Sequence, residues 1–132
     1  MELNEIPFNK PYIVGRELYY MAQSVSFGNI AADGHFTKAC EEILCNQFKV
    51  QRSLMVTSCT SALEMAAILC DLQPGDEVIL PSYTFVSTAN AVVREGAKPV
   101  FVDIRPDTLN LDESALRERI TSRTKAVIPV HL

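Results

Sequence analysis

The sequence has no excess of positive charge, few glycines and no apolar run long enough to cross a membrane. Its 12 basic residues are outnumbered by 16 acidic ones, which gives a net charge of −4 and disfavours a nucleic-acid-binding surface. The uncharged run 78–93 contains several polar residues and is shorter than the roughly 20 apolar residues of a membrane span. The acidic start, Met1–Glu5, is atypical of a secretion signal. We therefore expect a cytoplasmic protein that binds neither nucleic acid nor a membrane.

Motifs for zinc and for common nucleotide folds are also missing. The four cysteines form no C-x-x-C pair and the two histidines are isolated, so no metal site is expected. Without a secretion signal, reduced thiols are favoured over a disulfide framework. Neither G-x-G-x-x-G nor Gly-Lys-Ser/Thr occurs, and the five glycines are scattered. A dinucleotide-dependent dehydrogenase and a P-loop enzyme are therefore poorly supported.

The composition of the sequence and the order of its segments are typical of a folded α/β protein. The chain has 132 residues, of which 48% are apolar and 21% charged, enough for one sizeable core. From residue 53 on, short apolar runs alternate with amphipathic segments, a pattern that predicts parallel strands joined by right-handed crossovers. The predicted helices are 17–27, 36–48, 61–71, 84–95 and 112–120, and the predicted strands are 53–57, 77–80, 99–102 and 125–130.

The two ends of the chain suggest how it is organised. Residues 1–50 are expected to form an N-terminal arm with helices, and residues 51–132 the first part of a larger α/β domain. The sequence stops directly after a predicted strand, although sites in open α/β sheets lie at the carboxyl ends of strands. We therefore expect an N-terminal part of a longer protein; the alternative is a complete small α/β domain.

The segment Thr57–Glu64 joins a predicted strand to a predicted helix through small hydroxyl residues. A helix N-terminus presents free backbone N–H groups and a positive dipole end, which suit a phosphate. Ser61 and Glu64 also have the spacing of a capping box, which requires no ligand. These local features leave both a plain cap and an anion site open.

A second strand-to-helix junction lies at residues 81–90 and contains Phe85. An aromatic side chain at this place could stack on a flat ring. Alternatively, Phe85 could join Val86, Ala89, Val92 and Val93 on the apolar side of its own helix. The spacing alone allows both interpretations.

Taken together, four segments resemble one known family. TSCTSALEMAA, QPGDEVILPSYTFVSTANAVV, GAKPVFVDIRPDTLNLD and TSRTKAVIPVH are similar, in order and spacing, to the N-terminal third of DegT-type sugar aminotransferases. The early segments PFNKPYIVGRELYYM and DGHFTKACEE fit the same family. The resemblance implies the N-terminal part of the large domain of a fold-type-I enzyme, with a mainly parallel sheet and flanking helices. It also implies pyridoxal 5'-phosphate (PLP) as cofactor.

The resemblance also implies roles for particular residues. Thr60 and Ser61 match the positions that hold the cofactor phosphate, and Phe85 matches the aromatic residue that stacks on the pyridine ring. No catalytic residue is assigned, because none of the five lysines lies in the family's Schiff-base motif, which is expected beyond position 132. Lys98 and Lys125 are expected to be surface charges near strand starts.

Weaker implications concern substrate binding. Asp33 and Gly34 match a turn near the family's sugar-nucleotide site. Thr88, Asn90 and His131 are expected near the same pocket. For these three, a structural role such as a cap, a packed polar group or a strand-end hydrogen bond is the alternative.

The reaction implied is transfer of an amino group from glutamate to dTDP-4-oxo-6-deoxy-D-glucose, giving dTDP-4-amino-4,6-dideoxygalactose for surface polysaccharide such as common antigen or lipopolysaccharide. The family implies a homodimer whose sites draw on both subunits. Two alternatives remain. Some relatives are sugar dehydratases in which histidine replaces the lysine, and a truncated chain could also be a non-enzymatic remnant that binds a partner.

Overall fold

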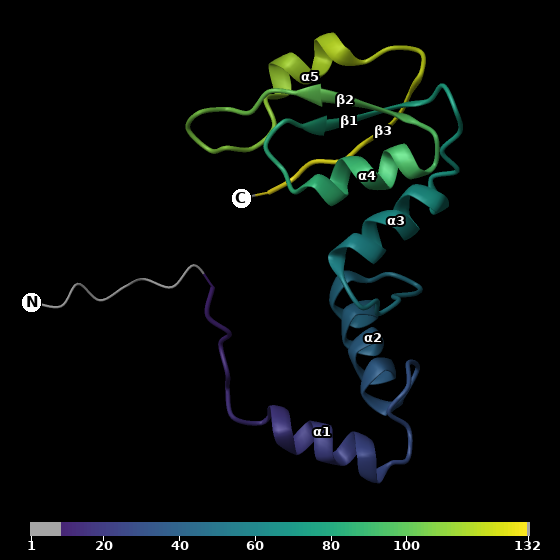
Figure 1. Cartoon of the computed structure of the whole chain (residues 1–132), viewed down its shortest axis with the longest axis vertical. Coiled ribbons are helices and arrows are strands. Elements are labelled where there is room, and N and C mark those ends of the chain that lie inside the picture. The colour runs from purple at the N-terminus through teal and green to yellow at the C-terminus, as the bar shows by residue number, and fades with distance from the viewer. Residues whose placement is uncertain (1–8, 132) are drawn as a thin grey trace, which may run out of the picture. The chain divides into compact units, whose positions relative to one another are not determined.

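A computed structural model of the chain describes residues 9–131, which divide into two compact units between Met55 and Val56 (Figure 1). The first unit contains α1 (Glu17–Ser26) and α2 (His35–Phe48). The second contains helices and a sheet in the order α3 (Cys59–Leu69), β1 (Glu77–Pro81), α4 (Val86–Arg94), β2 (Lys98–Val102), α5 (Glu113–Arg119) and β3 (Thr124–Val127). Within residues 9–131, no helix combines the length and the hydropathy needed to cross a bilayer.

The second unit is built on a three-stranded parallel sheet in the order β2-β1-β3. Ile79 at the centre of β1 is in register with Val100 on one side and Val127 on the other. Every residue of β1 is buried, as a central strand covered on both faces requires. The prediction of a mainly parallel sheet with flanking helices is therefore confirmed.

Two cores lie on opposite faces of β1, because successive side chains of a strand point to opposite sides. Val78 packs with Ala67 of α3 and with Ala91 and Val92 of α4. Ile79 packs with Val102 and with residues of and near α5. Figure 1 shows α5 on one side of the sheet and α4 on the other.

Local signals set the helix ends of this unit. Asp112 caps α5 by accepting hydrogen bonds from the backbone N–H groups of Ser114 (2.8 Å) and Ala115 (3.4 Å). Gly96 follows α4 with φ of +80°, and a Cβ built there would lie 3.2 Å from Pro74 Cγ. Glycine at this position therefore fits both the left-handed backbone and the close approach.

The first unit has two helices packed through aromatic rings. Tyr20 and Phe36 meet edge to face with ring centroids 5.3 Å apart, and Phe27 and His35 do so at 5.2 Å. The Glu17 carboxylate accepts hydrogen bonds from the backbone N–H groups of Val14 and Gly15, both 2.8 Å long, at the start of α1. These contacts tie the chain entering α1 to its first turn.

Two sequence-based predictions about this fold are wrong. Residues 53–57 form no strand, because a strand needs a ladder and no segment within residues 9–131 pairs with them. Leu54 and Met55 are accordingly exposed. The predicted last strand, 125–130, is shortened to Thr124–Val127, and its continuation keeps one ladder bond, from Ile128 N to Ile79 O (2.8 Å).

The predicted apolar side of α4 is confirmed for Val92 and wrong for Val86 and Val93. The helix buries Ser87, Thr88, Ala91 and Val92, whereas Val86 and Val93 are exposed. Small and hydroxyl side chains fit where α4 packs tightly against α3 and β1, and this requirement overrides the hydrophobic pattern.

Candidate functional site

A cavity of about 740 Å³ lies at the carboxyl ends of the strands in the second unit. It is bordered by the start of α3, by the junction between β1 and α4, and by the chain that follows β3. The lining residues are Cys59, Thr60, Leu63, Tyr83, Thr84, Phe85, Ser87, Thr88, Ile128, Pro129 and Val130. This is the edge of an open α/β sheet at which ligands are generally bound.

The first wall of the cavity is the N-terminus of α3. Ser58 caps this helix by accepting a hydrogen bond from the backbone N–H of Ser61 (3.1 Å), and the two hydroxyls lie 3.0 Å apart. The predicted capping box from Ser61 to Glu64 is therefore wrong: the helix starts earlier, and Glu64 pairs with Arg94 instead. Within residues 9–131, no protein atom accepts from the N–H groups of Cys59 and Thr60.

Thr60 and Ser61 are thus placed differently. Thr60 is exposed and lines the cavity. It lies in the first turn of α3, where its own backbone N–H and that of Cys59 are available as donors. Ser61 is half-buried, does not line the cavity, and is engaged with Ser58. The arrangement can bind an anion mainly through Thr60 and the backbone, with the helix dipole adding attraction.

The second wall carries a largely exposed aromatic side chain. Phe85 is the N-cap residue of α4, has extended backbone angles (φ −72°, ψ 145°), and is 74% exposed although it lines the cavity. The alternative that Phe85 packs on the apolar face of its own helix is wrong. An exposed ring face at a cavity is available for stacking on a flat ligand.

Beside Phe85, Thr84 and Thr88 form a partly buried hydrogen bond between their hydroxyls, 2.9 Å long. Thr88 is only 4% exposed, yet it lines the cavity. Thr84 was not a candidate from the sequence, because its only signal is a hydroxyl four residues before another hydroxyl. Tyr83, Leu63 and the segment 128–130 were missed as well, although strand-end position alone could have indicated them.

Two other predicted substrate-binding residues, His131 and Asn90, do not line this cavity. His131 is exposed and directly follows Val130, which lines the cavity. Asn90 is exposed on α4 and is not part of the lining. Lys98 begins β2 at the opposite end of the strands, 3.9 Å from Glu77, and Lys125 is exposed near the start of β3.

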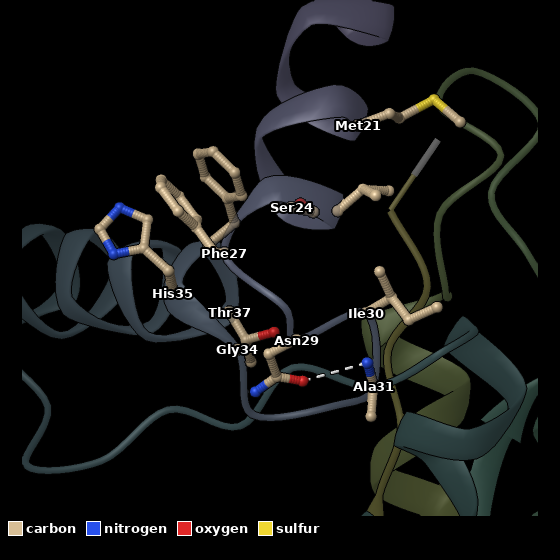
Figure 2. A pocket seen from close by; sticks show the side chains of 11 residues that line it. Met21, Ser24, Phe27, Asn29, Ile30, Ala31, Gly34, His35 and Thr37 are labelled. Atoms are coloured by element: carbon tan, nitrogen blue, oxygen red, sulfur yellow. Dashed lines mark hydrogen bonds between the residues drawn. The ribbon is translucent and has the colours of Figure 1, made fainter.

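Asp33 and Gly34 belong to the first unit, where a smaller pocket of about 330 Å³ lies between α1, α2 and their connecting loop (Figure 2). Gly34 is buried and lines this pocket, whereas Asp33 does not. Asp33 has a left-handed backbone (φ +63°), and its carboxylate lies 3.6 Å from Lys38 Nζ. Figure 2 shows Asn29 turned back onto the loop, where its side-chain oxygen accepts from Ala31 N (3.1 Å).

The electrostatics of the large cavity come from backbone and hydroxyl groups. None of the described residues that line it is charged. The groups with clearly shifted pKa values lie elsewhere. Hydrogen bonds from backbone N–H groups, Val14 first, lower the pKa of Glu17, and a hydrogen bond from Thr121 together with Arg123 lowers that of Glu77. The mutual pair Arg105–Asp107 raises the pKa of the arginine and lowers that of the aspartate.

Metal ligation finds no support in the same region. Among the described residues, no three His, Cys, Asp or Glu side chains are grouped so that they could hold a metal ion. The donors at the cavity are hydroxyls and backbone N–H groups, which suit a phosphate better than a cation.

Comparison with known proteins links this arrangement to one family. The profile of the DegT/DnrJ/EryC1/StrS aminotransferase family matches residues 11–132. GDP-perosamine synthase of Caulobacter vibrioides is 37% identical over 131 residues, which cover 99% of this chain and 35% of that protein. Spr1654 of Streptococcus pneumoniae, described as a sugar aminotransferase and solved in its PMP form, superimposes with a TM-score of 0.85 at 35% identity, covering 94% of this chain and 31% of that one.

A dehydratase is also among the similar structures. GDP-4-keto-6-deoxymannose-3-dehydratase superimposes with a TM-score of 0.75 at 28% identity, over 84% of this chain and 30% of that one. The chain thus spans about a third of the length of the relatives it matches.

Proposed function

Because the chain belongs to the DegT/DnrJ/EryC1/StrS aminotransferase family, we propose that it supplies the phosphate-binding and ring-stacking part of the cofactor site in a nucleotide-sugar aminotransferase. Pyridoxal 5'-phosphate is the cofactor of this family, and the Spr1654 relative is known in PLP and PMP forms. The observation that carries the proposal is the shared cavity of Thr60 and Phe85 at the carboxyl ends of the strands.

The cavity fits the cofactor group by group. The N–H groups of Cys59 and Thr60, with the Thr60 hydroxyl, bind the phosphate at the positive end of α3. The exposed ring of Phe85 stacks on the pyridine ring and fixes its plane. Leu63, Ile128 and Val130 give the cavity an apolar lining. When bound, the cofactor supplies an electron sink through which an amino group passes from donor to acceptor.

For the substrates, we propose glutamate as amino donor and a 4-oxo-6-deoxyhexose nucleotide as acceptor. The sequence motifs favour dTDP-4-oxo-6-deoxy-D-glucose and a role in surface polysaccharide synthesis. The similarity to a GDP-perosamine synthase supports amination of a nucleotide sugar and makes a GDP-linked acceptor the main competitor. For the whole protein, we propose a cytoplasmic homodimer.

A second candidate function is dehydration of a nucleotide sugar, which the structural similarity to a GDP-4-keto-6-deoxymannose-3-dehydratase favours. The two reactions differ in products. An aminotransferase converts glutamate to 2-oxoglutarate and yields an amino sugar, whereas a dehydratase yields a deoxy sugar. Incubating the gene's full product with PLP, glutamate and either the dTDP- or the GDP-linked oxo-sugar, followed by mass spectrometry of the sugar, separates them.

The cofactor proposal is tested by binding of PLP to the chain. We expect Thr60→Ala to weaken binding about tenfold, since one hydrogen bond to a charged group is lost. Combining it with Ser61→Ala should weaken binding little further, because the Ser61 hydroxyl is engaged with Ser58. The measurement is a fluorescence titration with PLP and, as competitor, inorganic phosphate.

Ser114→Ala is the matched control. Ser114 occupies the second position of α5, as Thr60 does in α3, but it does not line the cavity. PLP affinity equal in the Thr60→Ala and Ser114→Ala variants would contradict the proposed phosphate site.

A further inference from the structure

We propose that the hydroxyl pair Thr84–Thr88 is a positioning device that holds Phe85 in the orientation needed for ring stacking. The inference rests on the proposed cofactor site and extends it to two residues that act through Phe85 and not on the reaction itself. It starts from the placement of the pair on either side of Phe85 in the chain, at the entrance to α4.

Thr88 forms hydrogen bonds both with the residue before Phe85 and with the carbonyl group of Phe85. The Thr84 hydroxyl, just before Phe85, lies 2.9 Å from the Thr88 hydroxyl in the first turn of α4. The carbonyl oxygen of Phe85 accepts from the backbone N–H of Thr88 (3.0 Å). Thr88 is itself fixed, since it is 4% exposed. The two hydrogen bonds therefore define the backbone at Phe85 and the direction in which its side chain leaves.

The side chain of Phe85 cannot fix the start of α4 by itself, so other residues must do so. Most N-cap residues fix their helix entrance through a side-chain oxygen, which phenylalanine lacks, and α4 has no side-chain cap hydrogen bond. The ring is 74% exposed, so packing contributes little to its orientation. A group that must meet a ligand in one orientation binds more tightly when that orientation is set beforehand. The hydroxyl pair provides this preorganisation.

A competing explanation is that the hydroxyls contact the cofactor directly, since Thr84 and Thr88 also line the cavity. The two explanations differ in how they couple to Phe85. If the pair acts through Phe85, removing the pair has no further effect once the ring is gone. If the hydroxyls bind the ligand themselves, the two losses add.

The first measurement needs no cofactor. In the unmodified chain with labelled phenylalanine, three-bond NMR couplings across the Phe85 backbone should show one fixed φ, because the two hydrogen bonds act on that backbone. Thr88→Val keeps the side-chain shape and removes the hydroxyl, so we expect averaged backbone couplings at Phe85 in this variant. Thr84→Val should have the same effect, and Thr88→Ser should restore the couplings of the unmodified chain. Unchanged couplings in both valine variants would overturn the proposal.

The second measurement is a double-mutant cycle on PLP affinity. We expect Thr88→Val to weaken PLP binding about threefold to tenfold, the effect of one hydrogen bond, and to leave the affinity for inorganic phosphate unchanged. In a Phe85→Leu background the same substitution should change PLP affinity less than twofold. Additive losses would instead assign direct contact to the hydroxyls and overturn the positioning role.

Asp112→Ala controls for loss of stability, because it removes a helix cap from α5, which does not line the cavity. It should lower the melting temperature without weakening PLP binding. The proposed function and this inference fail separately. A chain that does not bind PLP while Thr88→Val still loosens the Phe85 backbone would contradict the function alone. Normal PLP binding by the unmodified chain, with the Phe85 backbone couplings unaffected in the valine variants, would contradict the inference alone.

Discussion

Glu77 is a carboxylate buried at the start of the central strand. Its two oxygens accept hydrogen bonds from the Thr121 hydroxyl and from Arg123 Nη2, both 2.7 Å long, and Lys98 lies nearby. The amino ends of β1 and β2 and the segment leading into β3 are thus held together at the edge opposite the cavity. Removing the Glu77 charge would therefore weaken the contacts that join these three segments.

These contacts make the stability dependent on pH in a definite direction. The hydrogen bond from Thr121, and then Arg123, lowers the pKa of Glu77 below its ordinary value of 4.5. A carboxylate with a depressed folded-state pKa stabilises the fold above the unfolded value, and this contribution is lost as the pH falls through the folded pKa. We expect Glu77→Gln to lower the urea midpoint at pH 7, with the difference from wild type shrinking from pH 5 to pH 3.

The control for this experiment is Glu118→Gln on α5, where the side chain is exposed. It should leave the urea midpoint nearly unchanged at both pH values. A constant difference between wild type and Glu77→Gln across the pH range would assign the effect to packing and not to the charge.

Site residues that lie in a recognisable sequence motif could be predicted. Residues whose role depends on a hydrogen bond to another side chain could not. Thr60 and Phe85 stand in segments whose residue order is itself informative, and both line the cavity. Ser58 and Thr84 matter through hydrogen bonds of their hydroxyls, and these bonds depend on the start of a helix to within one residue. Helix ends are the least predictable feature of a sequence, because several hydroxyl residues in a row offer alternative caps.

At the scale of the element, α4 shows where hydrophobic periodicity fails. Neighbouring valines have opposite environments, since Val92 is fully buried and Val93 is 55% exposed. The helix is amphipathic, but its tightly packed face is rich in serine, threonine and alanine, which a pattern of large apolar residues does not mark.

This orientation of α4 is testable with two identical substitutions. Val92→Ala should reduce the free energy of unfolding by about 2 kcal/mol, because two buried methyl groups are lost and a small cavity remains. Val93→Ala should change it by less than about 0.5 kcal/mol, as at most exposed positions. Urea denaturation measures both, and equal losses would indicate the face expected from the sequence.

Residues 53–57 illustrate the second limit on predicting elements. Their composition favours a strand, but strand formation depends on a partner that composition does not contain. The helices of the second unit were predictable to within a few residues, because each carries its own periodicity and its own capping or stop signal.

At the scale of the molecule, burial is unevenly distributed. All fully buried large side chains among the described residues lie in the second unit, whereas α1 and α2 bury none. The aromatic contacts between α1 and α2 leave Tyr19 and Phe27 largely exposed. The parallel sheet was predictable from the alternation of strands and helices, but this division of stability was not, because amphipathic helices look alike whether or not their apolar faces are covered.

Local stability should follow this distribution. We expect amide hydrogen exchange in β1 to be at least about a hundredfold slower than in α1 and α2, because amides in a packed sheet exchange only through large openings. Exchange measured by mass spectrometry on peptides from each unit tests this. Comparable protection in both units would show that the exposed apolar faces of α1 and α2 are covered in solution.

The described residues that line the large cavity carry no charge, and this has a kinetic consequence. A helix dipole acts only over about one turn, so it retains an anion that has arrived but does not draw one in from a distance. The chain as a whole carries a charge of −4, which repels a phosphate ester during its approach. Added salt screens that repulsion while leaving the short contacts in place. Capture of the ligand should therefore become faster with rising ionic strength, the reverse of the behaviour of a site built from lysine and arginine.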